Sequence, residues 1–527
     1  MSDRQRVVVV TGGGGGIGAA IAETISRTGA FVVTVDPLVS VDGSEQLPQP
    51  EQTTAGRIVA AGGAARASGV SVTDESGVRQ LFGELAEEFG GLAAVVNVAG
   101  ISRPTGFAKG SADDWLSVLS VHLDGYRNVL GAALPLMVAA GRGHILGVTS
   151  GSGWRAADAG AYGCAKRAVA SLTWQLGRHA PEGVVINAIS PIAATRMVTA
   201  ALGRTQPTTG AATGGLSLGS MPAPEHLGPL GAHLVGDAFT TCHGRVLFAG
   251  GSEVAVIDEP RLIEVVRSDD VPSVAHLLEA VTTIALASAE ANQVSGGGSN
   301  ARFGTLFDSP PNDELPTGVA RSCAVVSDRP EVAKAVVGAL EARGVACQQL
   351  GAPAALADVD ALDAVVVAMA GGQPVTGAAS DWERILSEHE GIVARIDADA
   401  QWARAVAEFA TTSGRPVRLV TVTEATTAGG RSRAQASAQL ARAGRKATRD
   451  LVLPFAVSAE SDDIPAELVA HLVCSAEAVG LAGAEMVTGA GWFGLRSHPR
   501  PIGSISFGGP AVPSWFDDAL REVAQPR

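Results

Sequence analysis

A run of glycines between an apolar strand and a helix constrains the fold of this chain more than any other feature. Residues 7–10 are four consecutive valines, and residues 11–18 read Thr-Gly-Gly-Gly-Gly-Gly-Ile-Gly. Glycines allow a sharp turn and let the backbone approach a pyrophosphate at the N-terminus of the following helix. Apolar runs at 31–35 and beyond alternate with helical patterns, which predicts a parallel, doubly wound α/β sheet. A plain turn without a ligand is the alternative.

The pattern of the first half returns in the second half. Three segments recur in the same order. The pairs are AVVNVAG at 94–100 with AVVVAMAG at 364–371, DWLSVLSVH at 114–122 with DWERILSEH at 381–389, and HLV at 233–235 with HLV at 471–473. We interpret this recurrence as an internal duplication of one fold. Coincidence within a chain rich in Ala, Gly and Val is the alternative.

The length of the chain supports the same division, because 527 residues exceed one compact domain. We predict two tandem Rossmann-like domains of the α/β class, the second degenerate and shortened. Residues 1–266 would form the domain that binds a dinucleotide, and residues 319–527 the second domain. Residues 267–318 would connect them through a helix at 274–291 and a linker, SGGGSN at 295–300.

Composition argues against several classes of protein. The net charge is −14 and the basic residues are scattered, which disfavours a nucleic-acid partner. The five cysteines include no CxxC pair, so we expect no metal site, no disulfide framework and a cytoplasmic location. No uninterrupted apolar stretch approaches about 20 residues, so we expect no membrane span.

Asp36 stands where a dinucleotide-binding fold holds the adenosine ribose. It ends the second predicted strand, 18 residues after Gly18. A carboxylate there accepts hydrogen bonds from ribose hydroxyls and repels a 2′-phosphate, which predicts NAD rather than NADP. Pro37 follows, so the sequence offers no adjacent arginine for a phosphate. A solvated acid at the end of a strand is the alternative.

Tyr162 and Lys166 are the strongest candidates for chemistry. Their i, i+4 spacing places phenol and ammonium on one helical face, where the cation would lower the pKa of the phenol toward neutrality. The chain holds only two Tyr and four Lys, so chance pairing is rare. Ser150, 12 residues before Tyr162, could orient a substrate oxygen, and Ser152 is a second candidate. The alternatives are a surface lysine on an amphipathic helix and an ordinary loop serine.

Together these motifs resemble the short-chain dehydrogenase/reductase family over residues 6 to about 266. TGGGGGIG matches the family's cofactor turn, NVAG at 97–100 matches its NNAG motif with one change, and NAISP at 187–191 lies where the family has a proline segment. The resemblance implies catalysis by Ser150, Tyr162 and Lys166, with His122 in the place of the family's helix asparagine. It implies a cofactor site formed by Gly12, Gly16, Ile17, Gly18, Asp36, Val72, Asn97, Ala99, Gly100, Tyr162, Lys166, Pro191 and Thr195.

Within the family, the N-terminal half resembles the (3R)-hydroxyacyl-CoA dehydrogenase part of the peroxisomal-type multifunctional enzyme and its bacterial relatives. The shared features are the insert after Asp36, the histidine in VHLDG at 121–125 and the ending SPIAATRM at 190–197. Ser71 departs from the aspartate usual before Val72, which weakens the match on the adenine side. His122 could hold a water or simply pack in its helix.

The second half resembles a degenerate copy of the same fold. Its glycine turn is replaced by Val-Ser-Asp-Arg-Pro-Glu at 326–331, and it contains no tyrosine. We therefore expect no catalytic part for His389, although it aligns with His122. The resemblance implies that this half mimics a partner subunit, so that a homodimer would mimic the family's tetramer.

The sequence thus predicts an NAD-dependent dehydrogenase for a secondary alcohol or ketone on a largely apolar small molecule, such as a 3-hydroxyacyl-CoA or a steroid-like alcohol. Trp154, Met197 and Met221 suggest the apolar pocket, and residues 206–224 a lid over it. The alternatives are a 3-oxoacyl thioester reductase and a dinucleotide-sensing or scaffold protein without turnover.

Overall fold

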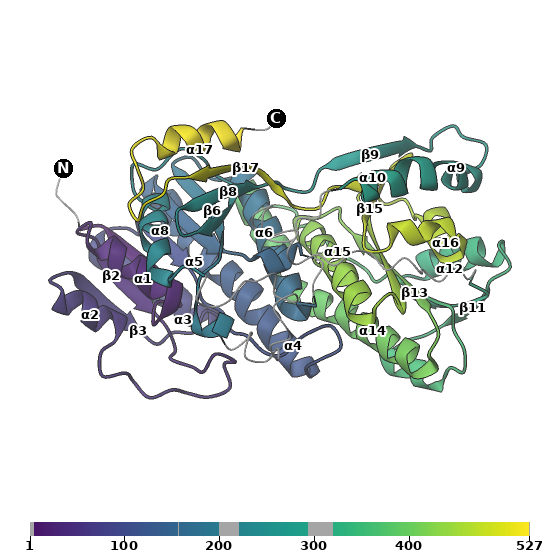
Figure 1. Cartoon of the computed structure of the whole chain (residues 1–527), viewed down its shortest axis with the longest axis horizontal. Helices are drawn as coiled ribbons and strands as arrows, with labels where there is room; N and C mark the ends of the chain where they lie inside the picture. The colour runs from purple at the N-terminus through teal and green to yellow at the C-terminus, as the bar shows by residue number, and fades with distance from the viewer. Residues whose placement is uncertain (1–4, 156–157, 200–220, 294–319, 526–527) are drawn as a thin grey trace.

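The computed structural model describes residues 5–155, 158–199, 221–293 and 320–525. It holds two α/β halves side by side, with their long helices meeting in the middle of the molecule (Figure 1). The predicted linker at 295–300 and most of the predicted lid at 206–224 lie outside the described residues.

Within the described residues, the first sheet has nine strands in the order β17-β8-β7-β6-β5-β4-β1-β2-β3. Seven are parallel, and β8 and β17 extend the sheet antiparallel. The bounds are β1 (Val7–Thr11), β2 (Phe31–Val35), β3 (Ala64–Ser68), β4 (Ala94–Asn97), β5 (Gly143–Val148), β6 (Val184–Pro191), β7 (Val246–Gly250), β8 (Glu253–Ile257) and β17 (Pro501–Ser506). The central strands read as continuous apolar runs because helices cover both faces of a parallel sheet.

The helices of the first half begin where the sequence offers caps and breaks. Asp74 accepts a hydrogen bond from the Gly77 amide at the start of α3, and Ser111 forms a capping box with Asp114 at the start of α4. The bounds are α1 (Gly16–Ser26), α2 (Thr54–Ala60), α3 (Glu75–Phe89), α4 (Ala112–Leu119), α5 (Gly125–Ala140), α6 (Gly160–Arg178) and α8 (Gly228–Leu234). A π-helical turn, Ser120–Asp124, separates α4 from α5.

The second sheet repeats the topology of the first. Its eight strands in the described residues follow the order β11-β10-β12-β13-β14-β15-β16-β9, which matches the first sheet strand for strand without a counterpart of β3. The bounds are β9 (Leu262–Arg267), β10 (Ser322–Val326), β11 (Ala346–Gln349), β12 (Ala364–Val367), β13 (Val417–Glu424), β14 (Val452–Ala459), β15 (Glu485–Gly489) and β16 (Trp492–Arg496). The prediction of two tandem Rossmann-like domains, the second shortened, is confirmed.

The two sheets exchange their last strands. β9, from the end of the first half, pairs antiparallel with β16 of the second sheet. β17, from the end of the chain, pairs antiparallel with β8 of the first sheet, and the helix α17 (Phe516–Ala524) packs on the same half (Figure 1). The predicted domain boundaries at 266 and 319 stay a prediction, but the sheets do not follow them.

Helices α6 and α15 form the main contact between the halves, and α14 packs against α4 beside them (Figure 1). The helices of the second half are α12 (Pro330–Glu341), α13 (Asp381–Glu388), α14 (Ile392–Ser413), α15 (Ala428–Thr448) and α16 (Ala466–Cys474). Nearly every residue of α15 up to Gly444 is buried. The small side chains of α15 let α6 approach closely, and α15 also packs against α14 of its own half.

The helix predicted at 274–291 is present as α9 (Val274–Val281), a π-helical turn (Thr282–Ala287) and α10 (Ser288–Ala291). By length and composition alone, it is the one helix among the described residues that could cross a membrane. Of its 18 residues, 17% are buried in the structure. Leu278 and Leu286 are buried in the second core, and the Thr282 hydroxyl contacts His471 Nε2 at 2.8 Å. These contacts attach the helix to the second half.

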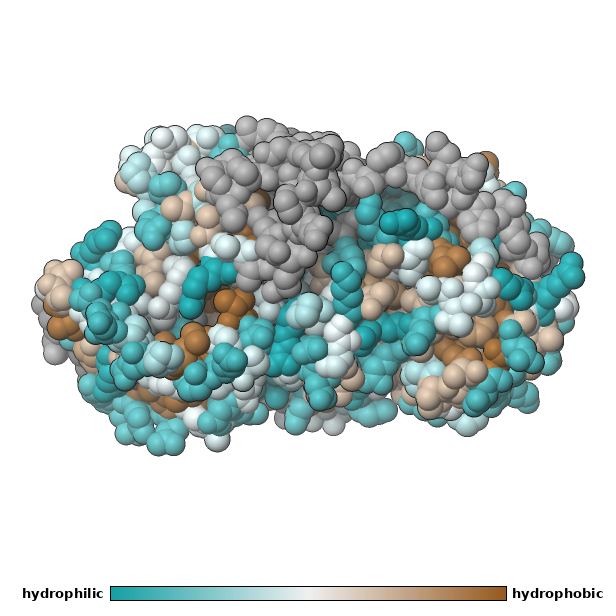
Figure 2. All heavy atoms as spheres, turned by 60° about the horizontal axis from the view of Figure 1, so that its bottom comes forward, coloured by the Kyte–Doolittle hydropathy of each residue, from teal (hydrophilic) through white to brown (hydrophobic). Residues whose placement is uncertain are grey.

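On the face drawn in Figure 2, hydrophilic side chains cover most of the described surface.

Candidate active site

The glycine turn after β1 is built for close approach of a ligand. Gly12 and Gly16 have φ of +65° and +54°, where other residues are strained. A Cβ on Gly12 would lie 2.8 Å from the Ala99 amide nitrogen, and one on Gly18 2.2 Å from the Gly12 carbonyl oxygen. The turn leads directly into α1, and Ile17 packs into the core beneath it. These residues fit a pyrophosphate held by backbone amides at a helix N-terminus.

Asp36 is fixed beside this turn. Its carboxylate accepts hydrogen bonds from the Gly14 amide at 3.0 Å and the Leu38 amide at 2.8 Å. A cavity of about 340 Å³ opens here, and Arg57 and Arg196 also line it. Sequence reasoning missed both arginines because they lie 21 and 160 positions from Asp36 along the chain. Arg57 is paired with Glu23 at 2.8 Å.

The predicted residues after β3 and at the end of β4 are held by hydrogen bonds, Asn97 through its side chain and Ala99 and Val72 through the backbone. Asn97 Oδ1 accepts from the Thr11 hydroxyl at 2.7 Å, and that hydroxyl oxygen accepts from the Ala99 amide at 3.4 Å. The Val72 carbonyl accepts from Asn128 Nδ2 at 3.0 Å, which ties the adenine-side loop to α5. The NVAG segment is thus bonded to the strand that ends in the glycine turn.

Pro191 and Thr195 approach the turn from the other side. Pro191 ends β6, and the side chain of Thr195 lies within 3.9 Å of the Cβ position at Gly16. Thr195 Oγ1 accepts from the Val198 amide at 3.3 Å. All thirteen predicted cofactor residues are described, and they line the carboxyl ends of neighbouring parallel strands, where α/β sheets bind their ligands.

Ser150, Tyr162 and Lys166 come together at this edge. The Ser150 and Tyr162 side chains are hydrogen bonded. Lys166 Nζ lies 5.6 Å from the centre of the Tyr162 ring and donates to the Val148 carbonyl at 2.7 Å. The Thr149 hydroxyl donates to the Lys166 carbonyl at 2.6 Å, which joins the end of β5 to α6. Ser152, the second candidate, instead accepts from Arg155 Nη2 at 3.0 Å.

The pKa values of Tyr162 and Lys166 differ from the prediction. Burial raises the pKa of Tyr162 above its usual 10, although the Ser150 hydrogen bond and the charge of Arg155 lower it. Burial also lowers the pKa of Lys166 to about 7. The prediction that Lys166 brings the phenol toward neutrality is wrong for this arrangement, because desolvation disfavours phenolate and ammonium alike.

His122 lies in the π-helical turn, edge-on to Tyr162 with 5.1 Å between ring centres. Its Nε2 is 2.8 Å from the Ile101 carbonyl, which can only accept, so Nε2 carries the hydrogen. Burial and the charge of Lys166 hold the pKa of His122 well below 6.5. Its Nδ1 is buried without a hydrogen-bond partner among the described residues and is left as an acceptor. Gly100 is required here, because a Cβ would lie 2.3 Å from the ring.

Trp154, predicted to line a pocket, is a core residue. Its side chain is fully buried and packs with Ala170, Trp174 and Phe248. The interpretation of Trp154 as a pocket residue is therefore wrong. Its backbone belongs to the loop after Ser150, which faces the second half of the molecule.

The corresponding edge of the second sheet carries charged side chains instead of a turn. Arg329 forms an ion pair with Glu424, whose carboxylate also accepts from the Gly371 amide at 2.6 Å. Asp328 accepts from the Ala370 amide at 2.8 Å. These groups occupy the place where the first sheet has its glycine cradle. Among the described residues, the His389 ring bonds to the Ile385 carbonyl of the preceding helix α13 and to Ser432 Oγ of α15.

Comparison with known proteins agrees with this geometry. The family described as short chain dehydrogenase matches residues 6–206. A short-chain type dehydrogenase/reductase of Mycobacterium tuberculosis is 37% identical over 196 residues, 37% of this chain and 68% of the relative. The cis-4-hydroxycyclohexanecarboxylate dehydrogenase of Sinomonas cyclohexanicum is 33% identical over 255 residues, 48% of this chain and 98% of the relative. The first half of the chain therefore carries a short-chain dehydrogenase domain, and the chain belongs to that family.

Two further likenesses bear on the predictions. The peroxisomal hydratase-dehydrogenase-epimerase of Saccharomyces cerevisiae is 33% identical over 199 residues, 37% of this chain and 22% of that protein, which confirms the predicted resemblance of the N-terminal half. The N-domain of a bacterial malonyl-CoA reductase, solved with NADP, covers 92% of this chain and 97% of its own at 14% identity, with a TM-score of 0.63. That likeness shows that the tandem fold occurs elsewhere. The protein is an oxidoreductase of the short-chain dehydrogenase type, a family that binds nicotinamide dinucleotides and acts on small molecules.

Proposed function

We propose that the chain is an NAD-dependent dehydrogenase of secondary alcohols on largely apolar small molecules. The observation that carries the proposal is the meeting of Ser150, Tyr162 and Lys166 beside a glycine cradle. A nicotinamide dinucleotide held by the glycine cradle would supply the acceptor for the hydride of the alcohol carbon. Ser150 orients the hydroxyl oxygen, and Tyr162 takes its proton.

Lys166 and His122 support the proton transfer from two sides. Lys166 Nζ lies 5.6 Å from the centre of the phenol ring, and although burial lowers its pKa to about 7, its protonated form would stabilise the phenolate as it forms. His122 is neutral, and its Nδ1 can accept a hydrogen bond from a water beside Tyr162. We propose that such a water, held in the π-helical turn, passes the proton onward.

Asp36 supports the choice of NAD. Both carboxylate oxygens are held by backbone amides, so the charge is fixed at the cavity where the adenosine ribose would lie. A 2′-phosphate there would meet a fixed negative charge. Arg57 and Arg196 in the same cavity favour the alternative, a reductase that uses NADPH, although Arg57 is already paired with Glu23.

The substrate class follows from the relatives' names. One relative is a dehydrogenase of a hydroxycyclohexanecarboxylate and another a peroxisomal hydratase-dehydrogenase-epimerase. The first name supports a secondary alcohol on a ring, and the second supports a dehydrogenase activity. The test is reduction of NAD⁺ and of NADP⁺ with a panel of cyclic hydroxy acids, 3-hydroxyacyl-CoA esters and hydroxysteroids. Turnover with NADP⁺ alone would overturn the choice of cofactor, and tight binding without turnover would favour a sensor.

We further propose that the second half replaces a partner subunit and that two chains associate in the cytoplasm. The packing of α6 against α15 supports the first part, because these helices occupy the same place in topologically matched halves. Light scattering tests the second part. A particle of 53.2 kDa at micromolar concentration would contradict the dimer.

A further inference from the structure

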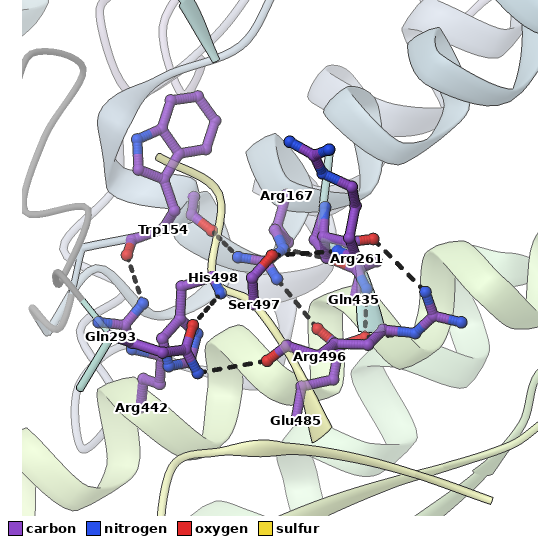
Figure 3. Close-up of polar contacts among 12 residues, drawn as sticks. Trp154, Arg167, Arg261, Gln293, Gln435, Arg442, Glu485, Arg496, Ser497 and His498 are labelled. Carbon is purple, nitrogen blue, oxygen red and sulfur yellow. Dashed lines mark hydrogen bonds and ion pairs between the residues drawn. The ribbon is translucent and has the colours of Figure 1, made fainter. Parts of the chain in front are cut away.

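The loop that follows Ser150 is held by the second half of the molecule. Gln439, on α15, donates from Nε2 to the Ser152 carbonyl at 3.0 Å and to the Arg155 carbonyl at 2.9 Å. Arg442, one turn further along α15, donates from Nη1 to the Trp154 carbonyl at 2.6 Å (Figure 3). Three carbonyls within four consecutive residues of the loop therefore receive their donors from the other half.

The loop is held within the first half by its own turn hydrogen bonds and by the buried Trp154 side chain, and the donors from α15 add to these at its carbonyls. Residues Gly151–Gly153 form a single 3-10 turn, and glycine at both ends leaves the backbone free to adopt other conformations. The turn also lies tight against α6, since a Cβ on Gly153 would be 2.9 Å from the Arg167 amide nitrogen. Gln439 is fully buried and Arg442 is 7% exposed, so both donors reach the loop from inside the interface, where a hydrogen bond costs most to lose.

The loop carries two groups that act on Tyr162. Ser150, its first residue, is hydrogen bonded to the phenol, and its Oγ also accepts from the Ser152 amide at 3.3 Å. Arg155, its last described residue, bonds to Ser152 Oγ, and its charge lowers the pKa of Tyr162. The other groups facing the phenol are Lys166 and the neutral His122. A shift of the loop would thus move the substrate-orienting hydroxyl and a cation together.

We propose that Gln439 and Arg442 are positioning residues for the active site of the first half, acting through the backbone of residues 152–155. The inference rests on the proposed dehydrogenase function. It gives the second half a role in catalysis that needs no cofactor or catalytic residue of its own.

The chain offers a matched control for the test. Gln175 is a buried glutamine in the same α6–α15 interface, and its Nε2 donates across it to the Ala428 carbonyl and the Ser432 hydroxyl at 3.2 and 3.0 Å. It lies at the far end of α6 from Tyr162 and has no contact with the loop. Its Oε1 also accepts from Arg431 Nε at 3.2 Å, so each methionine variant removes two or more cross-interface bonds, and only Gln439→Met releases the loop.

The experiment compares the two full-length variants in kcat, KM, melting temperature and the pH profile of kcat. Both substitutions should lower the melting temperature by similar amounts. Gln439→Met alone should lower kcat by about 10- to 100-fold, as expected for a misplacement of about 1 Å. It should also move the rise of activity to higher pH, because a displaced Arg155 no longer stabilises the phenolate. Arg442→Lys, which keeps a donor, should lose less than Arg442→Met.

Equal kcat and equal pH profiles for the two methionine variants would overturn the proposal, since the interface would then be only structural. A titration of tyrosinate absorbance separates this outcome from a failure of the proposed function. The chain has only two tyrosines, and burial raises the pKa of Tyr126 to about 12. A raised Tyr162 pKa in Gln439→Met, unchanged in Gln175→Met, would support the positioning role even if no substrate were turned over, and an unchanged pKa in both would contradict it.

Discussion

The carboxyl ends of the two sheets differ in chemistry although their strand orders match. In the first sheet, glycines with positive φ and the fixed Asp36 carboxylate leave a cavity. In the second sheet, the Arg329–Glu424 ion pair lies across the same position. Buried apolar strands therefore specify the fold in both halves, and a few residues at the strand ends decide which half can hold a ligand.

The two interface helices show the same contrast. α6 carries Tyr162 and Lys166 toward the cavity, whereas α15 carries polar side chains, such as Gln439 and Arg442, that reach into the first half. Between them, Arg167 bonds to Gln435 at 2.7 Å and to Glu485 at 3.2 Å, all three nearly inaccessible to solvent (Figure 3). Removing one partner of such a buried pair leaves an uncompensated charge. This contact therefore disfavours any other alignment of α6 against the second half.

Substituting each of the two tyrosines tests which of them takes part in the reaction. This prediction has the largest expected effect on kcat. Tyr162→Phe should lower kcat by about 10³- to 10⁴-fold, because it removes the proton acceptor. Cofactor binding, measured by fluorescence, should be retained. Tyr126 is fully buried and its hydroxyl meets Thr173 at 3.2 Å, so Tyr126→Phe should leave kcat nearly unchanged. Comparable losses in both variants would contradict the assignment.

The strand exchange is tested by two neighbouring aromatic residues near the C-terminus. Phe516 is fully buried in a core cluster of the first half, whereas Trp515 is 48% exposed. Phe516→Ala should lower the free energy of unfolding by about 3–5 kcal/mol, and Trp515→Ala should change it by less than about 1 kcal/mol. Denaturant titration in the presence of cofactor measures both. If residues 319–527 folded as a separate unit, Phe516→Ala would leave the stability of the cofactor-binding half unchanged.

Sequence patterns predicted the sheets and the proximity of Tyr162 and Lys166 because both depend on local signals. Continuous valines give parallel strands, and the i, i+4 spacing of Tyr162 and Lys166 places them on one face. The exchange of β9 and β17 could not be predicted, since a short antiparallel edge strand can extend either sheet. The π-helical turn at His122 could not be predicted either, because its hydrophobic pattern does not differ from that of a continuous helix.

Residues contributed from a distance were missed for a related reason. Arg57 and Arg196 reach the cavity of Asp36 only through the fold. Gln439 and Arg442 lie in the half that has no catalytic motif, and no local signal marks a side chain that donates to a backbone 287 positions away. The pKa of Tyr162 was predicted with the wrong sign because spacing reveals a neighbouring charge and says nothing of burial.

Asp36→Asn removes the carboxylate charge beside the glycine turn of the first sheet, and so tests the comparison between the strand ends of the two halves. The ratio of kcat/KM for NAD⁺ to that for NADP⁺ should fall by about 100-fold, since charge-assisted hydrogen bonds to the ribose are lost and repulsion is relieved. Asp42, in the insert, is bonded to the Ser40 and Ser44 hydroxyls, which hold its pKa at about 2. Asp42→Asn should leave the ratio unchanged. An unchanged ratio in Asp36→Asn would show that Arg57 and Arg196 decide the preference.

His122 and His389 align in sequence, yet only the first lies beside a tyrosine. His389 is fully buried between Ile385 O and Ser432 Oγ, and burial lowers its pKa to about 4. An unfolded histidine titrates near 6.5, so the unfolded chain binds more protons between these values, and stability falls as pH drops through this window. This linkage amounts to about 2 kcal/mol at about pH 5.

His389→Gln should therefore reduce the loss of stability between about pH 6.5 and about pH 4, and it should leave kcat at neutral pH unchanged. His276, exposed on α9, is the control for the same substitution, and His276→Gln should keep the pH dependence of the intact protein. Denaturant midpoints across this pH range measure the effect. If His389→Gln lowered kcat while stability kept its full pH dependence, His389 would have a part in catalysis, which would contradict the contrast between the halves. The effect would then pass through α15, because His389 bonds to Ser432, and Ser432 bonds to Ser171 on α6.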